Sequence, residues 1–87
     1  MIVTWDNAKR LANLDKHGLD FADLEFEFFM NSVVAPVRER RFKAIGSMHN
    51  GRVIVVIFAP RGTESVSVIS MRAANRKERS LLHGSSK

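Results

Sequence analysis

The residues best suited to chemistry are three arginines in the C-terminal part of the chain, Arg61, Arg72 and Arg76. A guanidinium group stays protonated and presents its N–H donors in a planar fork that fits the oxygens of a phosphodiester. Arg72 ends a β-prone run, Arg61 opens the turn before that run, and Arg76 lies one helical turn after Arg72. We therefore predict that the three catalytic side chains converge on one phosphate-sized site and stabilise charge developing there.

A phosphoryl-transfer site also needs groups that accept and donate a proton near neutral pH. The candidates are His17, His49, Glu39 and Glu78. His17 is the fourth predicted catalytic residue because its ordinary pKa lies near neutrality, although a histidine before Gly18 also suits a helix C-terminus. His49 equally fits a solvated turn, and Glu78 equally fits an ion pair with a neighbouring arginine.

The charge is polarised along the chain. Residues 1–31 carry three basic and six acidic side chains, whereas residues 32–87 carry eleven and three. A basic half attracts a polyanion such as nucleic acid, although a solvated basic surface without a ligand is the alternative. The predicted nucleic-acid contacts are Lys16, Arg41, Lys43, Arg52 and Arg79.

Length and composition indicate one domain over residues 1–87, with a frayed tail at 83–87. The chain has no cysteine, and no cluster of His, Asp and Glu has metal-ligand spacing, so we expect no metal and no cofactor. No apolar run reaches the roughly 18 residues that a membrane span needs, and no signal peptide opens the chain. We expect a cytoplasmic protein.

The elements that position these residues begin with a short strand at 2–5. A helix over 8–16 follows, with Asp6 as its N-cap and Gly18 as its C-cap. Asp20 is then predicted to cap a second helix with an apolar stripe. The residues of this stripe are Phe21, Leu24 and Phe28.

A hairpin is predicted from strands 41–49 and 52–59 around Asn50-Gly51, a pair that favours a two-residue type I′ turn. That turn pairs Gly46 with Val55 and Ala44 with Ile57, and it predicts an apolar face against the helices. This face includes Phe42, Ala44, Val55 and Ile57. Pro36 indicates an edge or a loop. A strand at 65–71 and a basic helix at 73–82 complete the order β-α-α-β-β-β-α, an α+β two-layer sandwich with a three-stranded antiparallel meander.

Three groups of residues carry a family resemblance. The first is Trp5-Asp6, Lys9, Asn13, Lys16-His17-Gly18 and Phe21. The second is Arg41, Ala44-Ile45-Gly46, Gly51-Arg52 and Arg61-Gly62. The third is Ile69-Ser70, Arg72, Ala74 and Glu78-Arg79. With these groups the chain resembles the BrnT family over residues 4–79, and it departs from the family pattern at Ser67, where arginine is usual, and in lacking a tyrosine near Leu82.

The resemblance implies a RelE-like fold and a type II toxin: a metal-independent endoribonuclease that cleaves RNA and arrests translation. It also implies a cognate ribbon-helix-helix antitoxin, through which alone the toxin reaches operator DNA. Two other functions stay open. One is a catalytically weak binding module that acts with the antitoxin, and the other is a ParE-like topoisomerase inhibitor.

Overall fold

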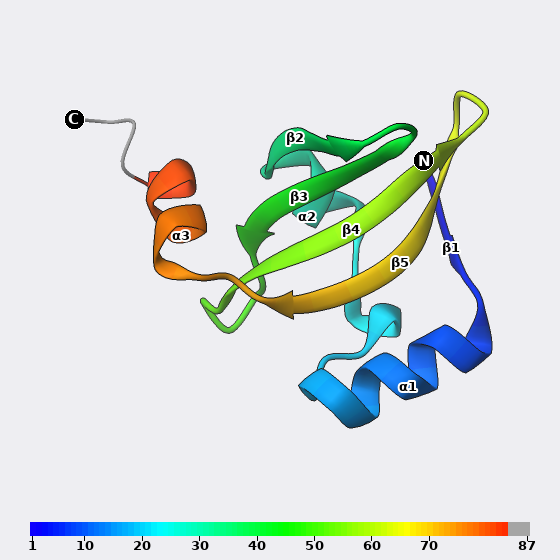
Figure 1. The fold of residues 1–87 in the computed structure, drawn as a ribbon, viewed down its shortest axis with the longest axis horizontal. Coiled ribbons are helices and arrows are strands. Elements are labelled where there is room, and N and C mark those ends of the chain that lie inside the picture. The colour runs from blue at the N-terminus through cyan, green and yellow to red at the C-terminus, as the bar shows by residue number, and fades with distance from the viewer. Residues whose placement is uncertain (84–87) are drawn as a thin grey trace.

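A computed structural model describes residues 1–83 as a twisted five-stranded sheet with helices on both faces (Figure 1). The strands are β1 (Ile2–Trp5), β2 (Val33–Arg38), β3 (Arg41–Ser47), β4 (Val53–Arg61) and β5 (Ser65–Ala73). The helices are α1 (Asn7–His17), the 3-10 turn η1 (Phe21–Asp23), α2 (Phe26–Met30) and α3 (Arg76–His83). None of the helices within residues 1–83 is long and apolar enough to cross a membrane.

The sheet is larger than the predicted three-stranded meander. Its strand order is β1-β5-β4-β3-β2, with β1 parallel to β5 and the other neighbours antiparallel. The additional antiparallel strand is β2, which contains Pro36, the residue expected at an edge or in a loop. A proline lacks the N–H that a central strand needs, and β2 accordingly forms an edge, with a register shift between Pro36 and Arg38.

The hairpin between β3 and β4 forms where predicted, but its turn and register differ. Among the described non-glycine residues only Arg40 has a positive φ, so Asn50 cannot take part in a type I′ turn. Instead the Met48 N–H donates to the Arg52 carbonyl, and only Gly51 is left-handed, at φ 86°. This three-residue loop is a type I turn followed by a glycine bulge.

The longer loop moves every β4 side chain to the opposite face from the one predicted. Ala44 pairs with Val56 and Ile45 pairs with Val55, because a shift of one residue inverts a strand whose side chains alternate. Phe42 and Ala44 do face the first helices, as expected. The placement of Val55 and Ile57 beside them was wrong, and both residues lie on the other face, where Val55 is fully buried.

The N-terminal helix follows its predicted caps. Asp6 accepts a hydrogen bond from the Lys9 N–H, and Gly18 ends α1 in the left-handed conformation at φ 70°. The predicted second helix is instead divided into η1 and α2, with Asp20 accepting from the Ala22 N–H. The division leaves the predicted stripe intact, since Phe21, Leu24 and Phe28 are all buried in the main core.

Two apolar clusters lie on the two faces of the sheet, so the two-layer description was incomplete. The main cluster joins η1, α2 and Leu19, which follows α1, to one face, while the smaller cluster of Ile45, Val55 and Ala74 joins the other face to Leu82 of α3. Figure 1 shows α3 at the end of the sheet opposite the β4–β5 turn. The final helix begins at Arg76, three residues later than predicted, and includes His83. Residues 84–87 of the predicted frayed tail lie outside the described residues.

Candidate nucleic-acid interface

A basic surface lies on the face of the sheet that carries α3. Because side chains alternate along a strand, the register places Arg41 and Lys43 of β3, Arg61 of β4 and Arg72 of β5 on this one face. Half-buried serines of β5 share the face with them: Ser65, Ser67 and Ser70. We call this surface the basic face. Cations and hydroxyl donors on one side of a sheet suit an extended polyanion.

At its α3 end the basic face carries an ion-pair cluster around one buried carboxylate. Glu78, only 4% exposed, accepts two parallel hydrogen bonds from Arg72: Nη1 to Oε1 at 2.8 Å and Nη2 to Oε2 at 2.9 Å. Lys43 donates from Nζ to Oε2 at 3.2 Å. The cluster carries two positive charges and one negative, so it retains a net positive charge on a partly exposed surface.

A local sequence pattern holds Glu78 in place. The Glu78 N–H donates to Asn75 Oδ1 at 2.8 Å, and the Asn75 N–H donates to Glu78 Oε1 at 3.0 Å. This reciprocal pair is a capping box at the first turn of α3. Glu78 was expected to be a base or an ion-pair partner, and its part in the cap was not predicted. The spacing of Asn75 and Glu78, three residues apart, is the sequence pattern that indicates it.

The cluster changes the protonation of Glu78. Arg72 is the main cause that lowers the pKa of Glu78 from its ordinary 4.5 to about 2, and Asn75 and Lys43 act in the same direction against the effect of burial. The same bond raises the pKa of Arg72. At neutral pH both groups are therefore ionised, and Glu78 is poorly suited to act as a general base.

We expect the protein to lose stability as the pH falls from about 5 to about 2. Unfolded Glu78 takes up a proton near pH 4.5, whereas folded Glu78 stays ionised until about pH 2. Its contribution is thus complete above pH 4.5 and is lost as the pH falls through 2. Urea unfolding across this range tests the expectation, with a steeper loss in the parent than in Glu78→Gln. Arg10 also lowers the pKa of Asp20 to about 2, but Asp20 is present in both proteins and contributes equally to both. Equal slopes of unfolding free energy against pH would exclude the contribution of Glu78.

The predicted convergence of three arginines was wrong for Arg61. In the β4–β5 ladder Arg61 pairs with Ser65, and Val55 pairs with Arg72. Arg61 therefore lies six positions along β4 from Val55, the partner of Arg72, which is about 20 Å at the usual rise of a strand. Arg61 is exposed beside the β4–β5 turn, at the far end of the basic face from α3.

The other predicted residues lie in three places. Arg76 and Arg79 lie on the first turns of α3, close in sequence to Glu78, and Arg79 donates from Nη1 to the Ala74 carbonyl at 2.8 Å. Lys16 and His17 are exposed in the last turn of α1, in the layer that covers the opposite face. The structure therefore does not bring His17 to the Arg72 cluster. Arg52 is exposed just after the β3–β4 turn.

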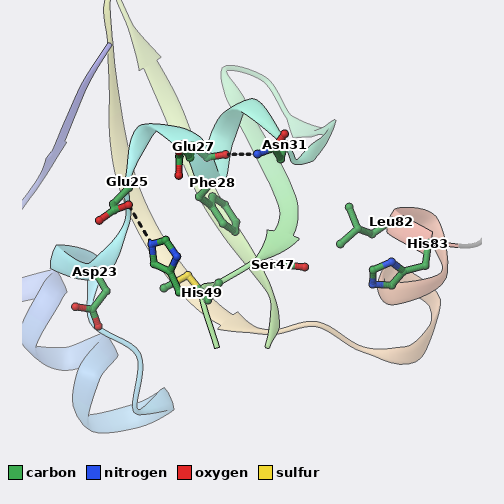
Figure 2. Close-up of a pocket in the computed structure, with 10 residues that line it drawn as sticks. Asp23, Glu25, Glu27, Phe28, Asn31, Ser47, His49, Leu82 and His83 are labelled. Carbon is green, nitrogen blue, oxygen red and sulfur yellow. Dashed lines mark hydrogen bonds and ion pairs between the residues drawn. The ribbon is translucent and has the colours of Figure 1, made fainter. Parts of the chain in front are cut away.

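A cavity of about 390 Å³ lies beside the β3–β4 turn (Figure 2). Its wall is acidic, with carboxylates from Asp23, Glu25 and Glu27, and His49 Nε2 lies 3.1 Å from Glu25 Oε1. Three carboxylates repel a phosphodiester. This cavity is therefore less suited to RNA than the basic face. His49 is exposed in the turn, in agreement with the predicted alternative of a solvated turn residue.

No group of three or more His, Cys, Asp or Glu side chains that could hold a metal ion occurs within residues 1–83. The basic face presents cationic side chains and serine hydroxyl groups. The fold and this surface define a small α+β protein with one basic sheet face.

Comparisons with known proteins identify the family. Residues 5–78 match the sequence model of a family described as "Ribonuclease toxin, BrnT, of type II toxin-antitoxin system". The crystal structure of the Brucella abortus ribonuclease toxin BrnT is 51% identical and has a TM-score of 0.83, with 87% of this chain and 99% of that chain covered. A search among curated proteins gave no significant match. The chain belongs to the BrnT family of type II toxin–antitoxin ribonuclease toxins.

Proposed function

We propose that the protein is a metal-independent endoribonuclease that binds RNA across the basic face and cleaves it beside Arg72 and Lys43. The observation that carries this proposal is the pair of cations that Glu78 holds at the α3 end of the face. Family membership supports RNA as the substrate. Cleavage of cellular RNA would arrest translation in the cytoplasm.

The proposed reaction is an internal phosphoryl transfer. The 2′-hydroxyl of the RNA loses its proton to water as its oxygen attacks the adjacent phosphorus. The bond from phosphorus to the 5′-oxygen breaks, the 5′-oxygen takes up a proton from water, and a cyclic phosphate and a free 5′-hydroxyl form. Arg72 and Lys43 stabilise the negative charge that builds up on the phosphate oxygens. Arg76, at the start of α3, is a further proposed phosphate contact. His17 and Lys16 are proposed to contact RNA that extends past α1.

Control of the toxin is proposed to follow the type II pattern, in which the protein binds a cognate antitoxin of the ribbon-helix-helix type and reaches operator DNA only through it. Exposed apolar side chains support a protein partner, because several large hydrophobic residues are uncovered on β1, α1, α2 and β2. Among those at least half exposed are Ile2, Leu11, Met30, Val34 and Val37. We also propose that the fold is RelE-like.

The decisive experiment incubates the purified toxin with RNA in the presence of EDTA and maps the ends of the products. We expect cleavage that EDTA does not abolish, products with 5′-hydroxyl ends, and inhibition by the product of a neighbouring antitoxin gene. Loss of cleavage on chelation would contradict metal independence. Growth arrest through loss of DNA synthesis would favour the topoisomerase inhibitor, and absence of both effects, including on ribosomes, would favour the binding module.

Arg61→Ala tests how far RNA extends along the basic face. Because Arg61 lies about 20 Å from Arg72 along β4, we expect the KM for a long RNA to rise while kcat stays nearly constant. The slope of log affinity against log salt should fall by about 1, as for the loss of one phosphate contact. Fluorescence anisotropy and steady-state kinetics measure both quantities. A large fall in kcat would instead indicate that Arg61 contacts the reacting phosphate.

A further inference from the structure

We propose that Glu78 is a positioning residue of the ribonuclease site, which sets the spacing and orientation of Arg72 and Lys43 for a single phosphate. This inference rests on the proposed function, and it assigns a task to a residue that would not touch RNA. Two of its features need explanation together: Glu78 is almost fully buried, and it is bonded to two cations that come from different strands.

The carboxylate brings together two groups that would otherwise repel each other. Arg72 Nη2 and Lys43 Nζ both bond to Glu78 Oε2, at 2.9 and 3.2 Å, so these nitrogens are at most about 6 Å apart. Charge-assisted N–H···O bonds are about 2.8 Å long, and one phosphate group can therefore bridge the two cations. Without the negative charge between them, Arg72 and Lys43 would separate.

The free donors also point to a shared ligand. Arg72 has five N–H groups, and the bonds to Glu78 and to the Ala73 carbonyl engage only its two terminal nitrogens. Three of the five N–H groups are thus used, and the Nε–H and one Nη2 N–H are left for another acceptor on a side chain that is 37% exposed. Lys43, at 27% exposed, likewise retains donors. Glu78 thus fixes the guanidinium plane through one edge and leaves the rest available to RNA.

Glu78 also caps α3, so the test must separate positioning from helix stability. Asn75→Ala removes the capping oxygen that accepts the Glu78 N–H but keeps the carboxylate between the two cations. Glu78→Gln keeps an oxygen that can accept from Asn75, whereas it removes the charge that pairs with Arg72 and Lys43. If Glu78 served α3 alone, the two variants would affect cleavage alike.

The test measures kcat, KM and thermal unfolding for the parent, Glu78→Gln, Asn75→Ala, Arg72→Ala and the double variant Glu78→Gln/Arg72→Ala. Glu27→Gln is the matched control, because it removes the same charge from an exposed site on α2. We expect Glu78→Gln to lower kcat about 10- to 100-fold, as a misplaced group does, without raising KM, since the basic face gains positive charge. On the Arg72→Ala background the same change should have almost no further effect on kcat.

Each outcome decides the inference. Equal losses of kcat in Asn75→Ala and Glu78→Gln would overturn the positioning role, and so would multiplicative losses in the double variant. In both cases cleavage by the parent would still support the proposed function. A parent that cleaves no RNA would overturn both. If Glu78→Gln unfolds, Lys43→Ala with Arg72→Ala provides the second cycle, and independent effects of these two cations would overturn the shared phosphate site.

Discussion

Arg72→Ala is expected to lower kcat for RNA cleavage by about 100- to 1000-fold, with a much smaller change in KM. The loss of one preorganised donor to developing charge costs about 3–4 kcal/mol of transition-state stabilisation. We assign this stabilising contact to Arg72, because two hydrogen bonds to buried Glu78 fix its guanidinium on the basic face. Single-turnover cleavage of a short RNA measures the effect without interference from product release.

Two further variants make this result specific. Arg72→Lys retains the charge but not the planar fork, so it should recover binding without full activity. Lys9→Ala removes a cation from an exposed position on α1 and should leave cleavage unchanged. Circular dichroism checks the fold of each variant, since Glu78 in Arg72→Ala still bonds to Lys43 and Asn75. A folded Arg72→Ala protein with normal kcat would place the reacting phosphate elsewhere.

Asn13→Ala is expected to reduce the free energy of unfolding by about 2–4 kcal/mol, the cost of leaving buried backbone groups unpaired. The Asn13 amide donates to the Met71 carbonyl at 2.9 Å and to the Leu19 carbonyl at 3.2 Å, and its oxygen accepts from the Met71 N–H at 3.1 Å. Met71 lies beyond the last β1 pairing, Trp5 with Val68. On the side of β5 where β1 has ended, the Asn13 side chain therefore supplies the hydrogen bonds that the Met71 backbone would otherwise lack.

Asn31→Ala is the matched control for this prediction. The Asn31 amide is exposed and donates one hydrogen bond to the Glu27 carbonyl, and water can replace that bond in the variant. We expect a change below about 1 kcal/mol there. Urea unfolding of both variants gives the comparison, and similar losses at the two positions would mean that the buried bonds of Asn13 contribute little.

The amino-acid sequence alone determined the features that depend on a few neighbouring residues. Asp6 and Gly18 predict the ends of α1 because capping hydrogen bonds and a left-handed φ are local requirements. Pro36 predicts an edge or a loop for a similar reason, and β2 forms an edge. The residues of the resemblance indicated the family that the comparisons confirm, whereas the polyanionic ligand predicted from the basic residues after residue 31 stays a prediction.

The tertiary structure decided which distant residues meet. Asn50-Gly51 is compatible with a two-residue and a three-residue loop, and only the packing of both sheet faces selects the register that pairs Ala44 with Val56. The same long-range pairing separates Arg61 from Arg72. It also brings Lys43 to Glu78, 35 residues away in the chain. Such contacts depend on strand order and on which face each side chain occupies, and these follow from burial over the whole fold rather than from local sequence.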